Sequence, residues 1–104
     1  MLIVQGVFRV DPGERVAFLE ERSETMRVSR AEPGCLEYVF GADPLEPDRV
    51  ILSERWESQA DLDAHLAALT ERRRVEAEAG AEPGIGAISS DVAVYHIESV
   101  QQMT

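Results

Sequence analysis

The sequence predicts a small α+β protein of the ferredoxin-like class, in which an antiparallel sheet carries two helices on one face. Two observations support this. Four short runs are rich in β-branched and aromatic residues, and two longer stretches between them place apolar residues at helical spacing. Their order along the chain is β-α-β-β-α-β. Because 104 residues can build only one hydrophobic core, we expect a single domain over residues 1–104.

The first half of the chain predicts a strand followed by a helix. Residues 2–10 (LIVQGVFRV) form the strand, which Asp11, Pro12 and Gly13 end. Asp11 is the expected N-cap, with Pro12 at the first helical position. The helix should run to Arg30 and turn its apolar residues inward, namely Val16, Leu19 and Met26.

A hairpin is predicted next. Residues 35–42 (CLEYVFGA) and 50–57 (VILSERWE) are strands, and the segment 43–48 between them contains two prolines that neither a helix nor a sheet interior tolerates. A connection this short between strands requires antiparallel pairing.

The second helix is predicted to begin after Ser58 as its N-cap and to extend as far as Ala79, with a polar second half that is expected to fray. Its inward stripe has the spacing i, i+3, i+4, i+7 and consists of Leu62, His65, Leu66 and Leu69. Residues 80–86 are a predicted loop, and residues 91–100 are the last strand.

The strands carry apolar residues on both faces. The first strand offers Leu2, Val4, Phe8 and Val10 on one side, but Ile3 and Val7 on the other. Two helices can cover only one face, and monomers rarely expose large apolar patches. We therefore expect a homodimer with sheets packed face to face. The alternative is a monomer whose helices and loops wrap around the sheet.

Composition excludes several functions. A net charge of −10 argues against binding to nucleic acids or anionic membranes. The basic run Arg72 to Arg74 is flanked by glutamates and is interpreted as a solvated helix face. No apolar run is long enough for a membrane helix, and the N-terminal segment has no basic region of a signal peptide, so a cytoplasmic location is expected. Two histidines and one cysteine without zinc-type spacing predict no metal. The absence of lysine excludes a Schiff-base mechanism.

Three motifs carry a resemblance to a known family. They are E-P-G-C-x-x-Y at residues 32–38, E-x-W at residues 54–56 and L-x-A-H at residues 62–65. In this combination and spacing, residues 2–100 resemble the antibiotic biosynthesis monooxygenase family. The resemblance implies a dimeric α+β barrel, a pocket between sheet and helices in each subunit, and oxygenation of small quinol-type compounds without a cofactor.

Departures from the family's patterns narrow the choice of reaction. Relatives that degrade haem use an Asn, a Trp and a His at places that here hold Gly6, His65 and Val75, and the chain contains no Asn. Haem degradation is therefore rejected. Many relatives also carry a second histidine motif, whereas this chain reads ALTER over residues 68–72, so a mechanism that requires a histidine pair is in doubt.

Four residues are candidates for the site. Oxygenation without metal or flavin requires a base that deprotonates a phenol, hydroquinone or enol, and histidine suits this step near neutral pH. We expect His65 to be this base and to face the sheet, although a structural core histidine is the alternative. Glu54 and Trp56 share one strand face and are expected to shape the pocket. Glu54 either orients His65 or forms a structural buried ion pair, for example with Arg30. Trp56 either stacks on a planar substrate or fills the core.

The fourth candidate is Tyr38, which donates to a substrate oxygen if the hairpin register puts it on the face of Glu54. His96 is interpreted as structural or dimer-facing. The sequence thus predicts a cofactor-independent monooxygenase acting on a small phenolic, hydroquinone or enolic compound. The alternatives are a non-enzymatic ligand-binding dimer, or an isomerase or decarboxylase that uses the same pocket.

Overall fold

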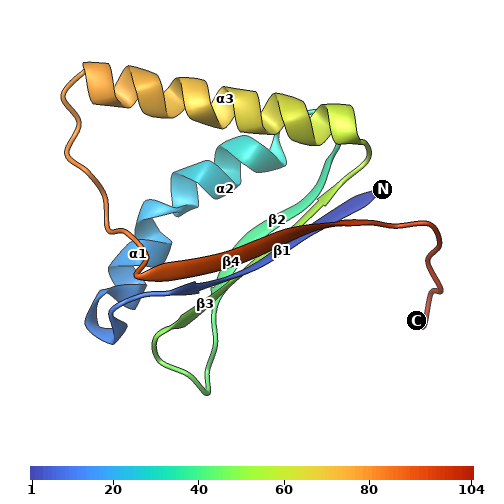
Figure 1. Ribbon diagram of the computed structural model, residues 1–104, viewed down its shortest axis with the longest axis horizontal. Coiled ribbons are helices and arrows are strands. Elements are labelled where there is room, and N and C mark those ends of the chain that lie inside the picture. The colour runs from blue at the N-terminus through green and yellow to red at the C-terminus, as the bar shows by residue number, and fades with distance from the viewer.

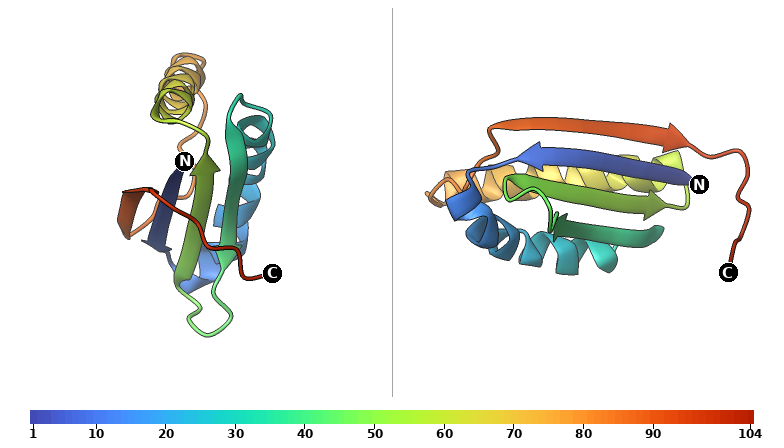
Figure 2. Two further views of the ribbon diagram at one scale, coloured as in Figure 1. Left: turned by 90° about the vertical axis from the view of Figure 1, so that its right-hand side faces the viewer. Right: turned by 90° about the horizontal axis from the view of Figure 1, so that it is seen from below.

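The computed structural model describes residues 1–104 as one antiparallel sheet with helices on one face (Figure 1). The strands are β1 (Leu2–Arg9), β2 (Cys35–Ala42), β3 (Arg49–Trp56) and β4 (Ser89–His96). The helical elements are the 3-10 turn η1 (Pro12–Glu14), α1 (Arg15–Glu21), α2 (Ser23–Arg30) and α3 (Gln59–Glu78). The strands lie in the order β2-β3-β1-β4, and Figure 2 shows them side by side in front of the helices. The predicted ferredoxin-like fold is confirmed.

The first helical segment differs from the prediction of one continuous helix. Asp11 caps it as expected, accepting a hydrogen bond from the Gly13 amide at 2.8 Å. The helix breaks at Arg22, where the backbone N–H turns to the carbonyl of Leu19 and the Ser23 hydroxyl donates to the same oxygen. Within α1, Phe18 is buried whereas Val16 is 70% exposed, because residues two apart on a helix point to nearly opposite sides. The prediction that Val16 faces inward is wrong.

Helix α3 begins as predicted. The Ser58 hydroxyl accepts from the Asp61 amide at 3.2 Å, and the helix continues without a break to Glu78. Only Leu62 and His65 of the predicted stripe are buried, and Leu66 is 50% exposed. The reason is visible in Figure 1, where α3 touches the sheet near its first turns and then runs over α2. No helix is both long enough and apolar enough to cross a bilayer.

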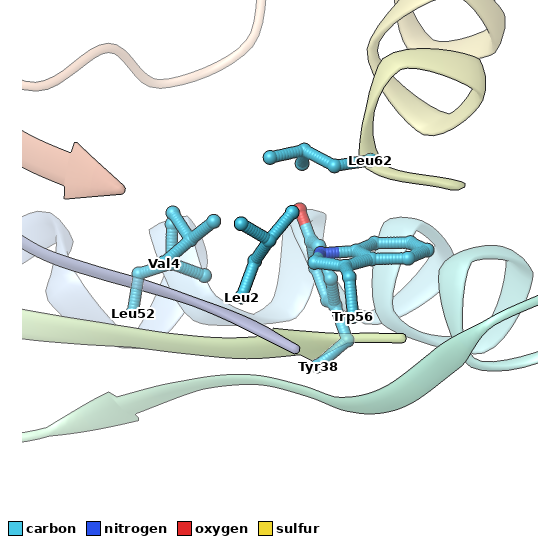
Figure 3. Packing of buried hydrophobic residues seen from close by; sticks show 6 residues of the cluster. All are labelled: Leu2, Val4, Tyr38, Leu52, Trp56 and Leu62. Carbon is cyan, nitrogen blue, oxygen red and sulfur yellow. The ribbon is translucent and has the colours of Figure 1, made fainter. Parts of the chain in front are cut away.

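The core occupies the end of the sheet below the start of α3. Leu2, Val4, Leu52 and Trp56 point to one face because side chains alternate along a strand. Figure 3 shows these residues and Tyr38 rising from the sheet toward Leu62 of α3. A second cluster at the other end of the sheet consists of Val10, Phe18 and Val50.

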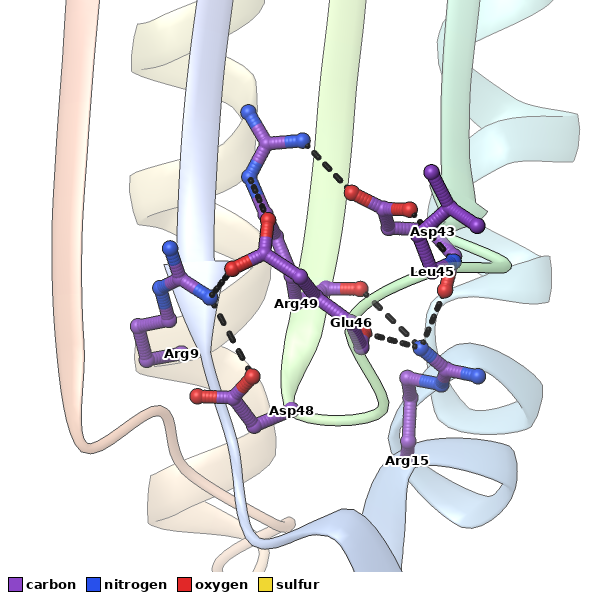
Figure 4. Close-up of polar contacts among 7 residues, drawn as sticks. All are labelled: Arg9, Arg15, Asp43, Leu45, Glu46, Asp48 and Arg49. Atoms are coloured by element: carbon purple, nitrogen blue, oxygen red, sulfur yellow. Dashed lines mark hydrogen bonds and ion pairs between the residues drawn. The ribbon is translucent and has the colours of Figure 1, made fainter.

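A polar network fixes the turn between β2 and β3 (Figure 4). Arg15, at the start of α1, donates to the main-chain carbonyls of Asp43 and Glu46 at 2.9 and 2.8 Å. Within the turn, Arg49 pairs with Asp43 at 2.9 Å, and Arg9 pairs with Glu46 and Asp48. The turn that the sequence leaves irregular is therefore tied to both β1 and α1.

The face of the sheet away from the helices is open. Ile51 and Tyr95 on this face are 39% and 51% exposed. Strand β4 has no buried residue at all, and Val92 and Val94 on its helix side are each 45% exposed. Strand β4 ends at His96 and not at the predicted residue 100. His96 pairs with Leu2, the first residue of β1, so beyond it only the Met1 carbonyl is available to accept a hydrogen bond from the Ile97 amide.

We predict that Arg15→Ala lowers the free energy of unfolding by about 1–3 kcal/mol, since the main-chain carbonyls of Asp43, Glu46 and Arg49 lose a charged donor. Urea denaturation followed by circular dichroism measures this change. Arg27→Ala, which removes only an exposed pair with Glu24, is the control and should change stability by less than about 0.5 kcal/mol. Equal effects of the two variants would contradict the role given to Arg15.

Candidate functional site

The turn between α2 and β2 brings a carboxylate to α3. Gly34 ends this turn with a φ of +78°, and a Cβ there would collide with the Asp61 side chain. The Gly34 carbonyl also accepts from the Glu57 amide at 2.9 Å. The turn therefore packs against the start of α3, with Glu32 beside the first turns of that helix.

His65 is buried and hydrogen-bonded to Glu32. Its side chain is 3% exposed, and Nδ1 lies 2.7 Å from Oε1 of Glu32. An ionised carboxylate can only accept, so Nδ1 carries the hydrogen of this bond. In a neutral imidazole the lone pair is then on Nε2, which faces the sheet side of the site. The expectation that His65 turns inward is confirmed.

Two aromatic side chains hold the imidazole on the sheet side. The ring of Trp56 lies 4.7 Å from that of His65, centroid to centroid, and the ring of Tyr38 lies 5.3 Å from it. Trp56 is fully buried, and Tyr38 is 4% exposed. Both therefore belong to the core as well as to the surroundings of His65.

Glu54 lies next to Trp56 and not next to an arginine. The indole N–H of Trp56 donates to Oε1 of Glu54 at 2.9 Å, and Nε2 of His65 lies 4.0 Å from the same oxygen. Burial raises the pKa of the Glu54 carboxyl, against the downward effects of the Trp56 hydrogen bond and the His65 charge. Of the two alternatives for Glu54, the pairing with Arg30 is wrong, because the Arg30 guanidinium donates to the Tyr38 carbonyl at 2.8 Å.

Glu32, which the sequence analysis does not select, is the residue that orients His65. It stands in the E-P-G motif at residues 32–34, where the sequence indicates only a turn. Proximity to His65 arises because α2 ends beside α3, and sequence spacing cannot reveal that contact. The signal in the sequence that could have pointed to Glu32 is the E-P-G motif itself, because the turn does not require an acidic residue at that position.

The hairpin register puts Tyr38 on the face of Glu54. Tyr38 lies directly opposite Glu54 in the β2–β3 pair, after an irregularity between Cys35 and Glu37. Burial is the main cause that raises the pKa of the Tyr38 phenol, and the charge of Glu54 raises this pKa further. A hydrogen bond with Ser29 lowers it in part. Tyr38 is thus held as a neutral hydroxyl.

Two spaces adjoin these residues, one between α2 and α3 and one between the helices and the sheet. The first, called here the small hollow, measures about 30 Å³ and is lined by Val28, Ser29, Glu32, His65, Ala68, Leu69 and Arg72. Its size corresponds to about one water molecule. The second space, called the groove, measures about 450 Å³ and lies between α1 and α2 on one side, α3 on the other, and the sheet. Its lining residues are Phe8, Glu21, Arg22, Thr25, Tyr38, Phe40, Leu69, Arg72, Arg73, Glu76, Glu82 and Gly84.

The two spaces share a wall and differ in what they can hold. Leu69 and Arg72 line both, and Tyr38 lines only the groove. The groove has the volume of a small-molecule site, whereas the small hollow does not. Arg72 and Arg73 line the groove, but Arg73 and Arg74 are exposed and only Arg72 is half-buried, so the interpretation of residues 72–74 as a solvated helix face is wrong for Arg72 alone. His96 is exposed on β4, apart from these residues.

Comparison with known proteins identifies the family. The family model of the antibiotic biosynthesis monooxygenases matches residues 1–73. The chain belongs to this family. The three motifs that carry the resemblance, at residues 32–38, 54–56 and 62–65, all lie inside the matched segment, so the predicted relationship is confirmed.

One curated protein and two solved structures illustrate what this chain is similar to. The uncharacterized protein sll1783 of Synechocystis is 28% identical over 102 residues, covering 98% of this chain and 67% of that protein. A crystal structure from Deinococcus radiodurans superimposes with a TM-score of 0.79 at 17% identity and covers 100% and 99% of the two chains. A monooxygenase from the gene ActVA-Orf6 of Streptomyces coelicolor, in complex with nanaomycin D, has a TM-score of 0.69 at 16% identity and covers 99% and 92%. These structures share the fold of this family member.

We predict that Glu54 makes stability depend on pH in a definite direction. Its folded-state pKa is raised above 4.5, so its contribution to the free energy of unfolding is fully present below that pH and is lost as the pH rises through the raised value. In Glu54→Gln this loss disappears, and the variant should gain stability relative to the parent as the pH rises. Urea denaturation at a series of pH values measures the difference.

A second variant tests whether the environment of Glu54 sets this pH dependence. Trp56→Phe removes the N–H that donates to Glu54, which should raise the pKa of Glu54 further and extend the pH range over which stability falls. A difference between Glu54→Gln and the parent that does not change with pH would contradict the assignment.

Proposed function

We propose that this member of the antibiotic biosynthesis monooxygenase family is a cofactor-independent monooxygenase that oxidises small phenolic, hydroquinone or enolic compounds with O₂. The observation that supports this most directly is the buried pair of His65 and Glu32 at 2.7 Å, beside Tyr38 and near a groove of ligand size. Family membership supports the class of reaction.

The proposed reaction needs no external reductant. A hydroquinone and O₂ contain the atoms of a hydroxyquinone and one water, so one oxygen atom enters the ring and the other leaves as water. All electrons for the reduction of O₂ come from the substrate. The protein's task is to deprotonate the substrate and to stabilise the resulting anion, which then transfers an electron to O₂.

The proposed roles follow from the positions of the side chains. The substrate lies in the groove, and the neutral Tyr38 hydroxyl donates a hydrogen bond to its oxygen. His65 accepts the proton on Nε2 through a relay water molecule, because the imidazole is too enclosed to touch an aromatic ring directly. Glu32 keeps the hydrogen of the imidazole on Nδ1, and Glu54 and Trp56 enclose its other side.

The same enclosure favours the alternative of a non-enzymatic ligand-binding protein. A groove floored by aromatic rings can hold a planar molecule even if His65 never exchanges a proton with it. An isomerase or decarboxylase would use His65 without consuming O₂.

We predict that the parent protein consumes O₂ with a panel of hydroquinones and that His65→Gln lowers kcat at least about 100-fold, the usual contribution of a general base. An oxygen electrode measures the rates, and thermal unfolding verifies that the variant is folded. Absence of uptake by the parent would contradict the monooxygenase proposal. Ligand-dependent melting without any product would then support the binding function.

Glu32 acts on the reaction through His65 and is therefore a positioning residue. Glu32→Gln should lower kcat about tenfold or more and leave KM nearly unchanged, because the amide can also donate and no longer fixes the hydrogen on Nδ1. The matched control is Glu37→Gln, which breaks an exposed pair with Arg55 and should leave kcat as in the parent. A rise in KM with unchanged kcat would contradict the positioning role.

We also propose that two copies associate through the open face of the sheet. Ile51 and Tyr95 are exposed there, and both sides of β4 lack a covering element. A partner sheet would bury these apolar side chains without disturbing the groove, which lies on the opposite face.

Ile51→Arg should shift the protein from dimer to monomer in sedimentation velocity, since a charge would have to be buried at the interface. Leu45→Arg is the control, because Leu45 is 88% exposed on the β2–β3 turn and outside the sheet face. A monomeric parent, or a dimer unaffected by Ile51→Arg, would contradict this interface.

A further inference from the structure

The groove has a floor of aromatic rings. Phe40 lies 5.7 Å from Phe8 and 5.9 Å from Tyr38, centroid to centroid, and all three line the space. Such a surface favours a flat aromatic ligand stacked or packed edge-on against it. This much agrees with the proposed function and says nothing about further groups on the ligand.

Three arginines lie in the walls of the groove, and two of them, Arg22 and Arg72, are fixed by contacts with neighbouring residues. Arg22 lies with its guanidinium carbon 3.6 Å from the centre of the Phe18 ring and donates to the Ile85 carbonyl at 3.2 Å. Arg72 donates to the Thr25 hydroxyl at 2.6 Å. These contacts fix two positive charges, one on each side of the groove.

The carboxylates of the groove are mostly engaged with these two arginines. Glu21 pairs with Arg22 at 3.4 Å and also accepts from the Ile85 amide. Glu76 lies 3.8 Å from Arg72. Glu82 is exposed on the loop after α3 and makes no hydrogen bond or ion pair.

Arg73 is the arginine of the groove that makes no hydrogen bond or ion pair. Its positive charge acts to lower the pKa values of Arg22 in the opposite wall and of Tyr38 in the floor. Burial lowers the pKa of Arg22, and Arg73 lowers it further; burial raises the pKa of Tyr38, and Arg73 acts against this. Arg73 lines the groove together with Tyr38, Phe40 and Arg22, and an anion between Arg22 and Arg73 would stabilise these two like charges.

We propose that the groove selects planar phenolic compounds that carry a carboxylate, with the ring over Phe40 and Tyr38 and the carboxylate on Arg73. Guanidinium and carboxylate can form two parallel charge-assisted hydrogen bonds, which gives this pairing direction as well as strength. Arg22 adds a second positive charge across the groove. The inference rests on the proposed function and names the class of substrate that it takes.

The test compares two probes that differ only in the acid group. Binding of 1-hydroxy-2-naphthoate and of 1-naphthol is measured by isothermal titration calorimetry on the full chain. The parent should bind the acid at least about tenfold more tightly, since a hydrogen-bonded charge pair contributes more than the 1.4 kcal/mol that corresponds to tenfold.

Variants assign the selectivity to one side chain. Arg73→Gln should weaken binding of the acid at least about tenfold and leave binding of the naphthol unchanged. Arg74→Gln is the matched control, because Arg74 pairs with Glu71 and Glu78 away from the groove, and it should bind both probes as the parent does. Thermal unfolding shows that both variants are folded.

Three results would overturn this inference: equal affinity of the parent for both probes, unchanged binding of the acid by Arg73→Gln, or no binding of either probe at millimolar concentration. Failure of the monooxygenase proposal is a separate observation, namely no O₂ uptake with neutral hydroquinones. A protein that prefers the naphthoate yet consumes no O₂ would support the selectivity of the groove and contradict only the reaction.

Discussion

The site depends on burying one imidazole between the sheet and the start of α3. A buried polar ring requires hydrogen-bond partners, and His65 finds one in Glu32 at 2.7 Å. This contact exists only because Gly34 lets the chain turn at a positive φ and pack against Asp61. The geometry of one turn therefore determines which nitrogen of His65 carries hydrogen, and through it the direction in which the residue can accept a proton.

The second carboxylate of the cluster has a different environment from the first. Glu32 lies at the edge of the small hollow, whereas Glu54 is enclosed among Trp56 and the strand side chains of the core. Burial raises the pKa of Glu54. Opposite environments for paired carboxylates are a common means of separating their roles.

Local signals in the sequence predict most of the fold, and contacts between distant segments account for what they miss. Caps at Asp11 and Ser58 and the alternation of the strands predict the elements to within a few residues. The position of His65 follows from the same periodicity. Glu32 could not be predicted as its partner, because the contact depends on how α2 ends beside α3. The contact of Arg72 with Thr25 of α2 depends on the same packing of helices, which the charge pattern of its own helix does not contain.

The most direct test of this account is the tautomer of His65, measured by ¹⁵N NMR of the imidazole in the histidine-labelled protein. The account predicts that the neutral ring carries its hydrogen on Nδ1, with a proton resonance shifted downfield by the bond to Glu32, and that Glu32→Gln abolishes this resonance. A hydrogen on Nε2 with a bare Nδ1, or an imidazole that exchanges freely with water, would contradict it.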